Sequence, residues 1–131
     1  NIRKKLFNLY LIVILQYNNK EMGLAKTEIF TDEQNAIAAF AKAFAHPARV
    51  SILQHLYKIN SCVCGDLVEE IGLAQPTISQ HLKELKNLGL IKGSVEGTSV
   101  CYCIDTQNWT AMKNLMSQFL DQDLTNRQDC C

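Results

Sequence analysis

Residues 74–91 read AQPTISQHLKELKNLGLI and decide the fold, because a helix formed by this segment has two very different faces. Pro76 suits the first turn of a helix, and Gly89 suits the left-handed residue that ends one. One face carries hydroxyl, amide and ammonium groups. The opposite face carries an apolar stripe at helical spacing, made of Ile78, Leu82, Leu85 and Leu88. We therefore predict a helix that is buried on one side and offers polar groups on the other.

A second, shorter helix precedes this segment. Leu67, Val68 and Ile71 are its inward residues, and Gly72 is suited to the tight turn that follows. Two short helices joined by a tight turn, the second of them polar on its outer face, form a helix-turn-helix.

Residues 90–104, which follow the polar helix, have the pattern of a β-hairpin. Val100, Tyr102 and Ile104 alternate with two cysteines, and the turn is expected at residues 96–98. A hairpin directly after a helix-turn-helix is the wing of a winged helix.

Three further helices complete the expected fold. Thr31 and Gln34 have the spacing of a capping box, which predicts a helix beginning there. Pro47 is placed to begin the next helix, and its buried stripe should include Val50, Leu53, Leu56 and Tyr57. A last helix is expected from about Gln107 to Asp123. The fold class is thus mainly α with one β-hairpin, a winged helix-turn-helix of order α-α-α-α-β-β-α.

The 131 residues are enough for one domain. We place it at residues 22–125, between residues 1–21, which we expect to be a non-native leader or an N-terminal extension, and a flexible cysteine-containing tail at 126–131. Met22 would then be the natural start. The apolar run Leu6–Leu15 in the leader is too short to span a bilayer, so no membrane association is expected.

The formal net charge is zero, so a nucleic-acid binder of this composition needs a local polar or basic patch. The outer face of the polar helix provides one. Gln80 is the best candidate for reading a base, because an amide can pair bidentately with adenine. The full set of predicted DNA contacts, including phosphate contacts on the hairpin, is Gln75, Thr77, Ser79, Gln80, His81, Lys83, Lys86, Lys92, Thr98 and Ser99.

The six cysteines form two C-x-C pairs, Cys62–Cys64 and Cys101–Cys103, and one adjacent pair, Cys130–Cys131. Internal disulfides within these pairs would make small strained rings, so reduced thiols in the cytoplasm are expected. Cys62 and Cys64 precede a predicted helix, whose positive end favours thiolates. Two neighbouring thiolates favour a soft cation. Cys101 and Cys103 are more simply explained as small apolar residues packed in a strand.

The chain resembles the ArsR-type metalloregulators, the family of arsenic and zinc repressors. The resemblance rests on FAHPARVSILQHL (44–56), CVCGDL (62–67), QPTISQHLKELKNLGLI (75–91) and EGTSVCYCID (96–105). It implies a cytoplasmic homodimer, joined through the first and last helices, that binds double-stranded operator DNA as a repressor. It also implies release of the DNA when a toxic metal or metalloid binds.

The resemblance further implies As(III) as inducer, with Sb(III), Cd(II) or Pb(II) as alternatives, and no organic cofactor. Cys62 and Cys64 match the family's metal-binding position. As(III) takes three sulfurs, so a third thiolate is required. We expect it from Cys130 or Cys131 on the tail, ahead of Cys101 and Cys103 on the hairpin.

The same fold could serve a repressor that responds to Cd(II) or Pb(II), or one that senses oxidation through its thiols. An enzyme is not expected, because redox enzymes typically place C-x-x-C beside a βαβ pattern, and neither is present.

Overall fold

Five helices and three short strands make up the part of the chain that the computed structural model describes, residues 29–65, 67–97 and 99–123. The elements follow in the order α2 (Asp32–Phe44), α3 (Pro47–Ile59), β1 (Val63–Cys64), α4 (Leu67–Ile71), α5 (Gln75–Asn87), β2 (Ile91–Glu96), β3 (Ser99–Ile104) and α6 (Thr106–Leu120). This is the predicted winged helix-turn-helix with one additional strand, β1.

The first two helices begin where local chemistry predicts. The Thr31 hydroxyl accepts a hydrogen bond from the Gln34 amide nitrogen at 3.2 Å, and Gln34 Oε1 accepts one from the Thr31 nitrogen at 2.9 Å. This confirms the capping box at the start of α2. Pro47 lies in the first turn of α3, and His46 Nδ1 accepts a hydrogen bond from the Ala48 nitrogen at 3.1 Å. Both helix starts therefore follow from residues close together in the sequence.

Each helix of the helix-turn-helix is followed by a glycine in the left-handed conformation. Gly72 has φ +74° after α4, and Gly89 has φ +71° after α5. Most other residues strongly disfavour this conformation, so each glycine allows the chain to leave its helix in a tight turn. The predicted ends of both helices are confirmed.

The sheet has the strand order β1-β3-β2 and is antiparallel throughout. In the hairpin, Ile91 pairs with Ile104 and Glu96 with Ser99, which leaves a two-residue turn. β1 pairs with the other edge of β3, with Val63 opposite Tyr102 and Cys64 opposite Cys101. The prediction of a two-stranded hairpin was therefore incomplete, because β1 is too short for sequence periodicity to reveal it.

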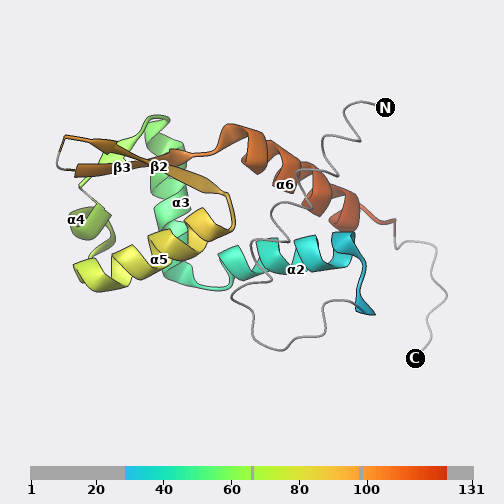
Figure 1. The fold of residues 1–131 in the computed structure, drawn as a ribbon. Coiled ribbons are helices and arrows are strands. Elements are labelled where there is room, and N and C mark those ends of the chain that lie inside the picture. Colours follow the sequence, from blue (N-terminus) through green and yellow to red (C-terminus); the bar gives the residue numbers. More distant parts are fainter. Residues whose placement is uncertain (1–28, 66, 98, 124–131) are drawn as a thin grey trace.

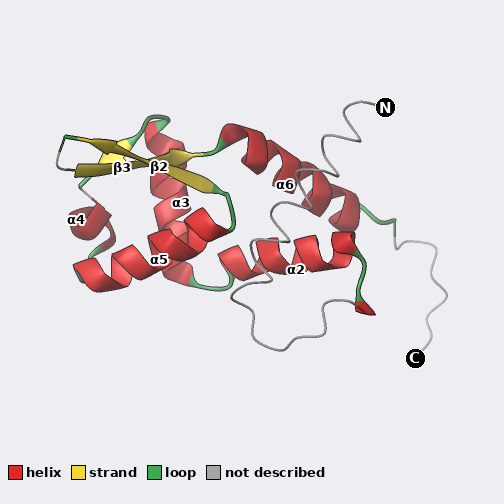
Figure 2. Cartoon of the chain, viewed as in Figure 1, coloured by secondary structure: helices red, strands yellow, loops and turns green. Residues whose placement is uncertain are grey.

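Figure 1 shows α2 and α6 at one end of the molecule, with α4 and the hairpin tip at the other. The small sheet lies at one edge of the molecule, with α3, α4 and α5 on one side of it (Figure 2). The largest fully buried side chains come from four of the helical and strand elements and one connecting loop; they are Phe40, Ile52, Leu56, Ile78, Leu85, Leu90 and Cys101. Their burial fixes α5 on the core by its apolar stripe, so its other face points outward.

Some details of the predicted helices are wrong. Tyr57 was assigned to the buried stripe of α3 but is 71% exposed. Helix α6 begins at Thr106, where Asp105 Oδ1 accepts a hydrogen bond from the Asn108 nitrogen, and it ends at Leu120 rather than Asp123. Among the described residues, no helix is both long and apolar enough to cross a membrane.

The predicted leader at residues 1–21, Met22 and the tail at 126–131 lie outside the described residues. The proposed domain limits at 22 and 125 therefore stay predictions.

Candidate functional site

Helix α5 presents the polar face that the sequence predicts. Its exposed polar residues are Gln75, Thr77, Ser79, Gln80, Lys83 and Lys86, and its buried ones include Ile78, Leu82 and Leu85. Glu84 carries the one carboxylate of this helix, and its Oε2 lies 3.7 Å from the Lys42 ammonium on α2. This ion pair draws the negative charge towards α2, so the rest of the exposed face offers only neutral and cationic groups.

His81 was predicted to lie on that outer face, and this prediction is wrong. It is only 9% exposed, and its ring centroid lies 4.4 Å from that of His46 at the start of α3. Burial lowers the pKa of His81, and His46 and Arg49 lower it further, whereas Glu84 opposes them. A neutral, buried imidazole in this position packs the helix against α3 and is unavailable to a base edge.

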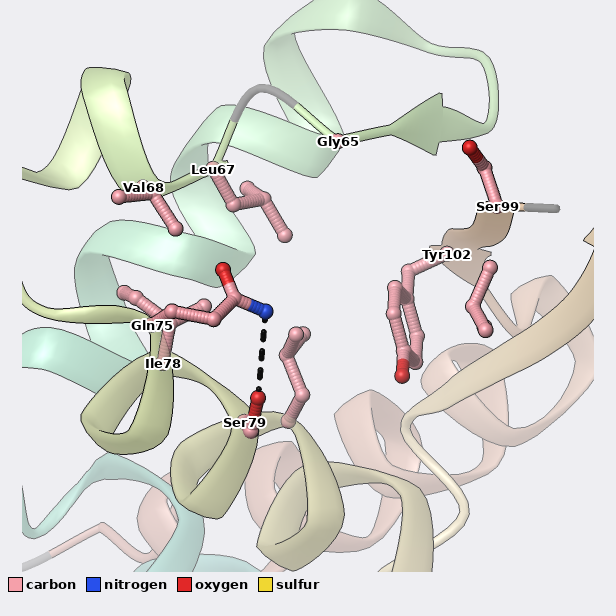
Figure 3. A pocket seen from close by; sticks show the side chains of 10 residues that line it. Gly65, Leu67, Val68, Gln75, Ile78, Ser79, Ser99 and Tyr102 are labelled. Carbon is pink, nitrogen blue, oxygen red and sulfur yellow. Dashed lines mark hydrogen bonds between the residues drawn. The ribbon is translucent and has the colours of Figure 1, made fainter.

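Residues from α5 and the hairpin come together around one open pocket of about 310 Å³. Gln75 and Ser79 line it from α5, and Ser99 and Tyr102 line it from β3 (Figure 3). Gln75 Nε2 donates a hydrogen bond to Ser79 Oγ at 3.3 Å. Predicted contacts that are twenty residues apart in the sequence thus share one surface. The hairpin candidate Thr98 lies outside the described residues.

Lys92 does not belong to that surface. It pairs with Cys103 in the β2–β3 ladder and lines a different groove, together with Cys62 and Trp109. The sequence placed Lys92 near α5 because it follows the helix closely, but strand alternation turns its side chain to the other face of the sheet.

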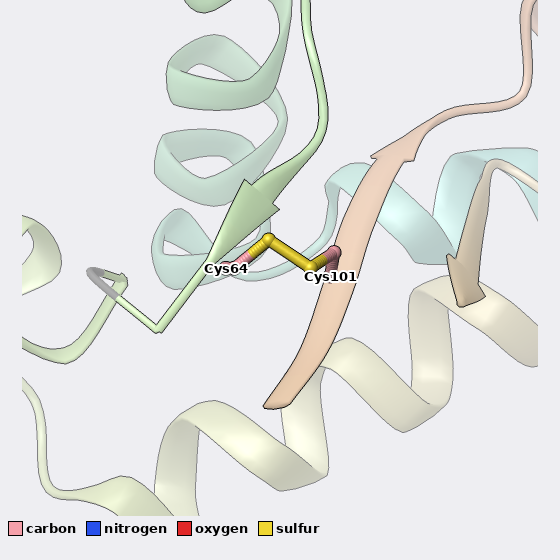
Figure 4. Close-up of a disulfide and its surroundings, with 2 residues drawn as sticks. All are labelled: Cys64 and Cys101. Atoms are coloured by element: carbon pink, nitrogen blue, oxygen red, sulfur yellow. A yellow bond between two sulfur atoms is a disulfide. The ribbon is translucent and has the colours of Figure 1, made fainter. Parts of the chain in front are cut away.

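Four cysteines meet where β1 pairs with β3, and we call Cys62, Cys64, Cys101 and Cys103 the cysteine ladder. Cys64 and Cys101 face each other with their Cα atoms 4.1 Å apart and form a disulfide (Figure 4). This short separation is typical of a non-hydrogen-bonded antiparallel pair, in which side chains approach most closely. The expectation that all of these thiols are reduced is therefore wrong for Cys64 and Cys101.

Cys62 and Cys103 form the second rung of the ladder. Continuing the register of Val63 with Tyr102 places Cys62 opposite Cys103. Both are free thiols, Cys62 exposed and Cys103 half-buried. A hydrogen bond with the Cys62 thiol raises the pKa of Cys103 and partial burial adds to this effect, whereas the Lys92 ammonium opposes it. The two thiols are therefore direct neighbours.

The predicted electrostatic setting of Cys62 and Cys64 also needs correction. They lie in and just before β1, and α4 begins only at Leu67 and is five residues long. The positive end of that helix therefore does not explain their chemistry. Among the described residues, no three His, Cys, Asp or Glu side chains are arranged to hold a metal ion. One reason is that Cys64 and Cys101 are bonded to each other.

Of the cysteines predicted as a third ligand, the structure describes two and leaves two undescribed. Cys130 and Cys131 lie outside the described residues, so their role stays a prediction. Cys101 and Cys103, which were ranked below them, lie directly opposite Cys64 and Cys62. One signal in the sequence could have indicated this arrangement. Two C-x-C motifs have the same spacing, and alternate residues of a strand share a face.

Comparisons with known proteins agree with this fold. Residues 46–92 match the family model described as bacterial regulatory protein, arsR family. The uncharacterized HTH-type transcriptional regulator MJ1325 of Methanocaldococcus jannaschii is 44% identical over 68 residues, covering 51% of this chain and 75% of that protein. A probable mercury resistance operon repressor of Streptomyces lividans is 27% identical over 109 residues, covering 83% of this chain and 86% of the relative.

Among solved structures, HlyU from Vibrio cholerae superposes with a TM-score of 0.56 at 26% identity. The superposition covers 71% of this chain and 100% of that one. The likeness in fold therefore extends beyond residues 46–92, which match the family model.

Proposed function

This chain belongs to the ArsR family of bacterial regulatory proteins, and from that premise we propose that it is a transcriptional repressor that releases operator DNA on binding a soft metal or metalloid ion. The family consists of DNA-binding regulators, not enzymes. The observation that carries the proposal is the exposed polar face of α5, held by a fully buried stripe and flanked by a hairpin. Its place of action would be the cytoplasm, where the operator is.

In this proposal α5 enters the major groove of double-stranded DNA. Gln80 reads a base edge, and Thr77 and Ser79 lie beside it on the same exposed surface. Lys83 and Lys86 contact phosphates. Gln75 and Ser99 extend this surface across the pocket towards the hairpin, where Thr98 is also expected to contribute. Lys92 and His81 are not part of it.

A homodimer would present two copies of α5 to successive half-sites. The exposed large apolar residues at the α2–α6 end of the molecule support this assembly; they are Ile29, Phe30, Phe44, Phe119 and Leu120. Phe119 is 54% exposed and Leu120 is 68% exposed, both on the last turn of α6. By contrast, Phe40 of α2 and Met112 of α6 are buried in the core of one subunit. The dimer contact is therefore proposed for the outer edges of α2 and α6.

The proposed inducer is As(III), with Sb(III), Cd(II) and Pb(II) as alternatives. Thiolates select ions of this soft class, and the similarity to a repressor named for mercury resistance supports the class. Cys62 and Cys64 would be ligands, with a third thiolate from Cys130, Cys131 or the hairpin cysteines. Because Cys64 is bonded to Cys101, the disulfide must be reduced before this set can bind an ion.

The disulfide favours a second candidate function, a repressor that responds to oxidation. It links β1, which leads into α4, with β3 of the hairpin. The strand before α4 and the hairpin after α5 are therefore joined covalently when the disulfide is formed. They are not joined when it is reduced. A change in DNA affinity with oxidation would follow from a difference in how well the two states fit the operator.

Operator release separates these functions. A DNA duplex that binds the reduced protein would first be selected from a random pool. The complex of protein and duplex would then be titrated with As(III), Sb(III), Cd(II), Pb(II), Zn(II) and peroxide. We expect one of the soft ions to release the duplex from the parent protein. Cys62→Ser and Cys64→Ser should each still bind the duplex but should not release it when the ion is added. Normal release from either variant would remove those residues from the site. Release by peroxide alone would favour the redox function, and failure to select any duplex would contradict DNA binding.

A further inference from the structure

The pocket of about 310 Å³ between α5 and the hairpin offers hydrogen-bonding groups without charge. None of the described residues that line it is ionic, and its polar side chains are those of Gln75, Ser79, Ser99 and Tyr102. The first three belong to the predicted DNA-binding surface. Tyr102 is half-buried on β3 and is the one polar side chain of this described lining outside that surface.

The position of the Tyr102 ring depends on a glycine in the neighbouring strand. Tyr102 lies directly opposite Gly93 in the β2–β3 pairing. A Cβ atom on Gly93 would lie 3.0 Å from Tyr102 Cε1 and 3.3 Å from Cδ1, which is closer than ordinary van der Waals contact. The ring therefore lies across β2 in room that a glycine leaves for it. Figure 3 shows the side chain directed into the pocket, with the hydroxyl at its end.

The polar groups of the pocket have hydrogens to donate. Gln75 Nε2 donates one of its two hydrogens to Ser79 Oγ at 3.3 Å. This bond uses a lone pair of the Ser79 oxygen, so the Ser79 hydroxyl hydrogen can be donated to another group. The Tyr102 phenol and the Ser99 hydroxyl are further donors. The pocket is therefore suited to an acceptor with several oxygen atoms.

The place of the pocket determines which part of a DNA duplex it would meet. In the proposed complex α5 enters the major groove, and the hairpin lies beside it. A sugar–phosphate backbone separates the major groove from the minor groove, so a pocket between these two elements faces the backbone and not a base edge. Uncharged hydroxyl and amide side chains commonly donate hydrogen bonds to phosphate oxygens.

We propose that Tyr102 donates a hydrogen bond to one backbone phosphate of the operator, which lies in the pocket beside Gln75, Ser79 and Ser99. Gly93 is a positioning residue that leaves room for the Tyr102 ring. This inference deepens the proposed function, on which it rests, by adding a DNA contact outside the predicted set. Because the contact includes no cation, it displaces no counterion from the DNA.

The first test compares Tyr102→Phe with the parent chain, because this change removes the hydroxyl and keeps the ring. Fluorescence anisotropy would measure binding to the selected operator and to an unrelated duplex of equal length. We expect Tyr102→Phe to weaken binding about tenfold, as for the loss of a hydrogen bond to a charged group. The loss should be equal for both duplexes, since a phosphate carries no sequence information. Stability in urea should not change.

Two further variants are compared in the same assay. Tyr57→Phe, which makes the same chemical change at an exposed position of α3, is the matched control and should bind DNA normally. Tyr102→Phe should leave the slope of log affinity against log salt unchanged. Lys86→Ala, which removes a proposed cationic contact, should reduce that slope by about 0.9.

Methylphosphonate substitution, one phosphate at a time, would locate the contact. At one phosphate in each half-site, the substitution should weaken the parent protein more than it weakens Tyr102→Phe, and at all others it should affect both equally. Gly93→Ala should weaken DNA binding by the parent protein and have little further effect in Tyr102→Phe. An equal loss in both backgrounds would remove Gly93 from this role.

The outcomes separate this inference from the proposed function. A parent chain that binds operator, together with Tyr102→Phe of equal affinity, would refute the Tyr102 contact alone. A loss confined to the operator, or identical methylphosphonate patterns for the two proteins, would also overturn a phosphate contact. A parent chain that selects no duplex would refute the repressor function and this contact with it.

Discussion

Helix α5 and the cysteine ladder differ in how far apart along the chain their interacting residues lie. The two faces of α5 are set within thirteen consecutive residues, because neighbours on a helix face are three or four positions apart. The disulfide of the ladder joins residues with a sequence separation of 37. Functional surfaces of the first kind follow from sequence periodicity, and those of the second kind require the strand register to be known.

The largest expected effect concerns the buried face of α5. Leu85 is fully buried, so Leu85→Ala should lower the free energy of unfolding by about 3 to 4 kcal/mol, through lost apolar transfer energy and the cavity left behind. Lys86→Ala, at the exposed neighbouring position, is the control and should change it by less than about 0.5 kcal/mol. Urea unfolding measures both. Similar values for the two variants would show that the faces of α5 are not distinct.

The next effect concerns the ladder and depends on its redox state. Without reductant, Cys64→Ser should lower the free energy of unfolding by about 3 kcal/mol, since the cross-link restricts the unfolded chain over 37 residues. Cys64 is exposed, so the serine itself should have little effect. In dithiothreitol the difference from the parent protein should nearly vanish.

The control for this second variant is Cys62→Ser, an exposed position on the same segment that is outside the disulfide. It should be close to the parent protein in both conditions. A Cys64→Ser effect that persists in reductant would mean that the ladder stabilises the fold by packing and not by its covalent bond.

A third prediction tests the exposed face of α5 directly. Gln80→Ala should weaken operator binding by about 1 to 3 kcal/mol, because one bidentate base contact is lost, and should leave stability nearly unchanged. Gln54→Ala, at an exposed position on α3, is the matched control and should bind DNA normally. Fluorescence anisotropy with labelled operator measures both affinities. Equal affinities for the two variants would remove Gln80 from base recognition.

The side chains that the sequence places wrongly show the same difference between local contacts and contacts with distant segments. His81 lies at the edge of the predicted polar face of α5, and it is buried because His46, from a different helix start, packs against its ring. Lys92 is close to α5 in sequence, but strand alternation places it beside Cys103. In both cases the helix or strand was predicted correctly, and a neighbour distant in sequence decided what the side chain faces.

The sequence by itself determined the helices, their caps, the hairpin and the polar face of α5, because each depends on contacts within a few residues. Thr31, Pro47, Gly72 and Gly89 mark these boundaries through their own conformational preferences. Only the tertiary structure decided that β1 pairs with β3. That pairing turns two separate C-x-C motifs into one ladder, with a disulfide on one rung and a thiol pair facing a groove on the other. Strand register is set by packing between distant segments, so the local pattern of residues does not specify it.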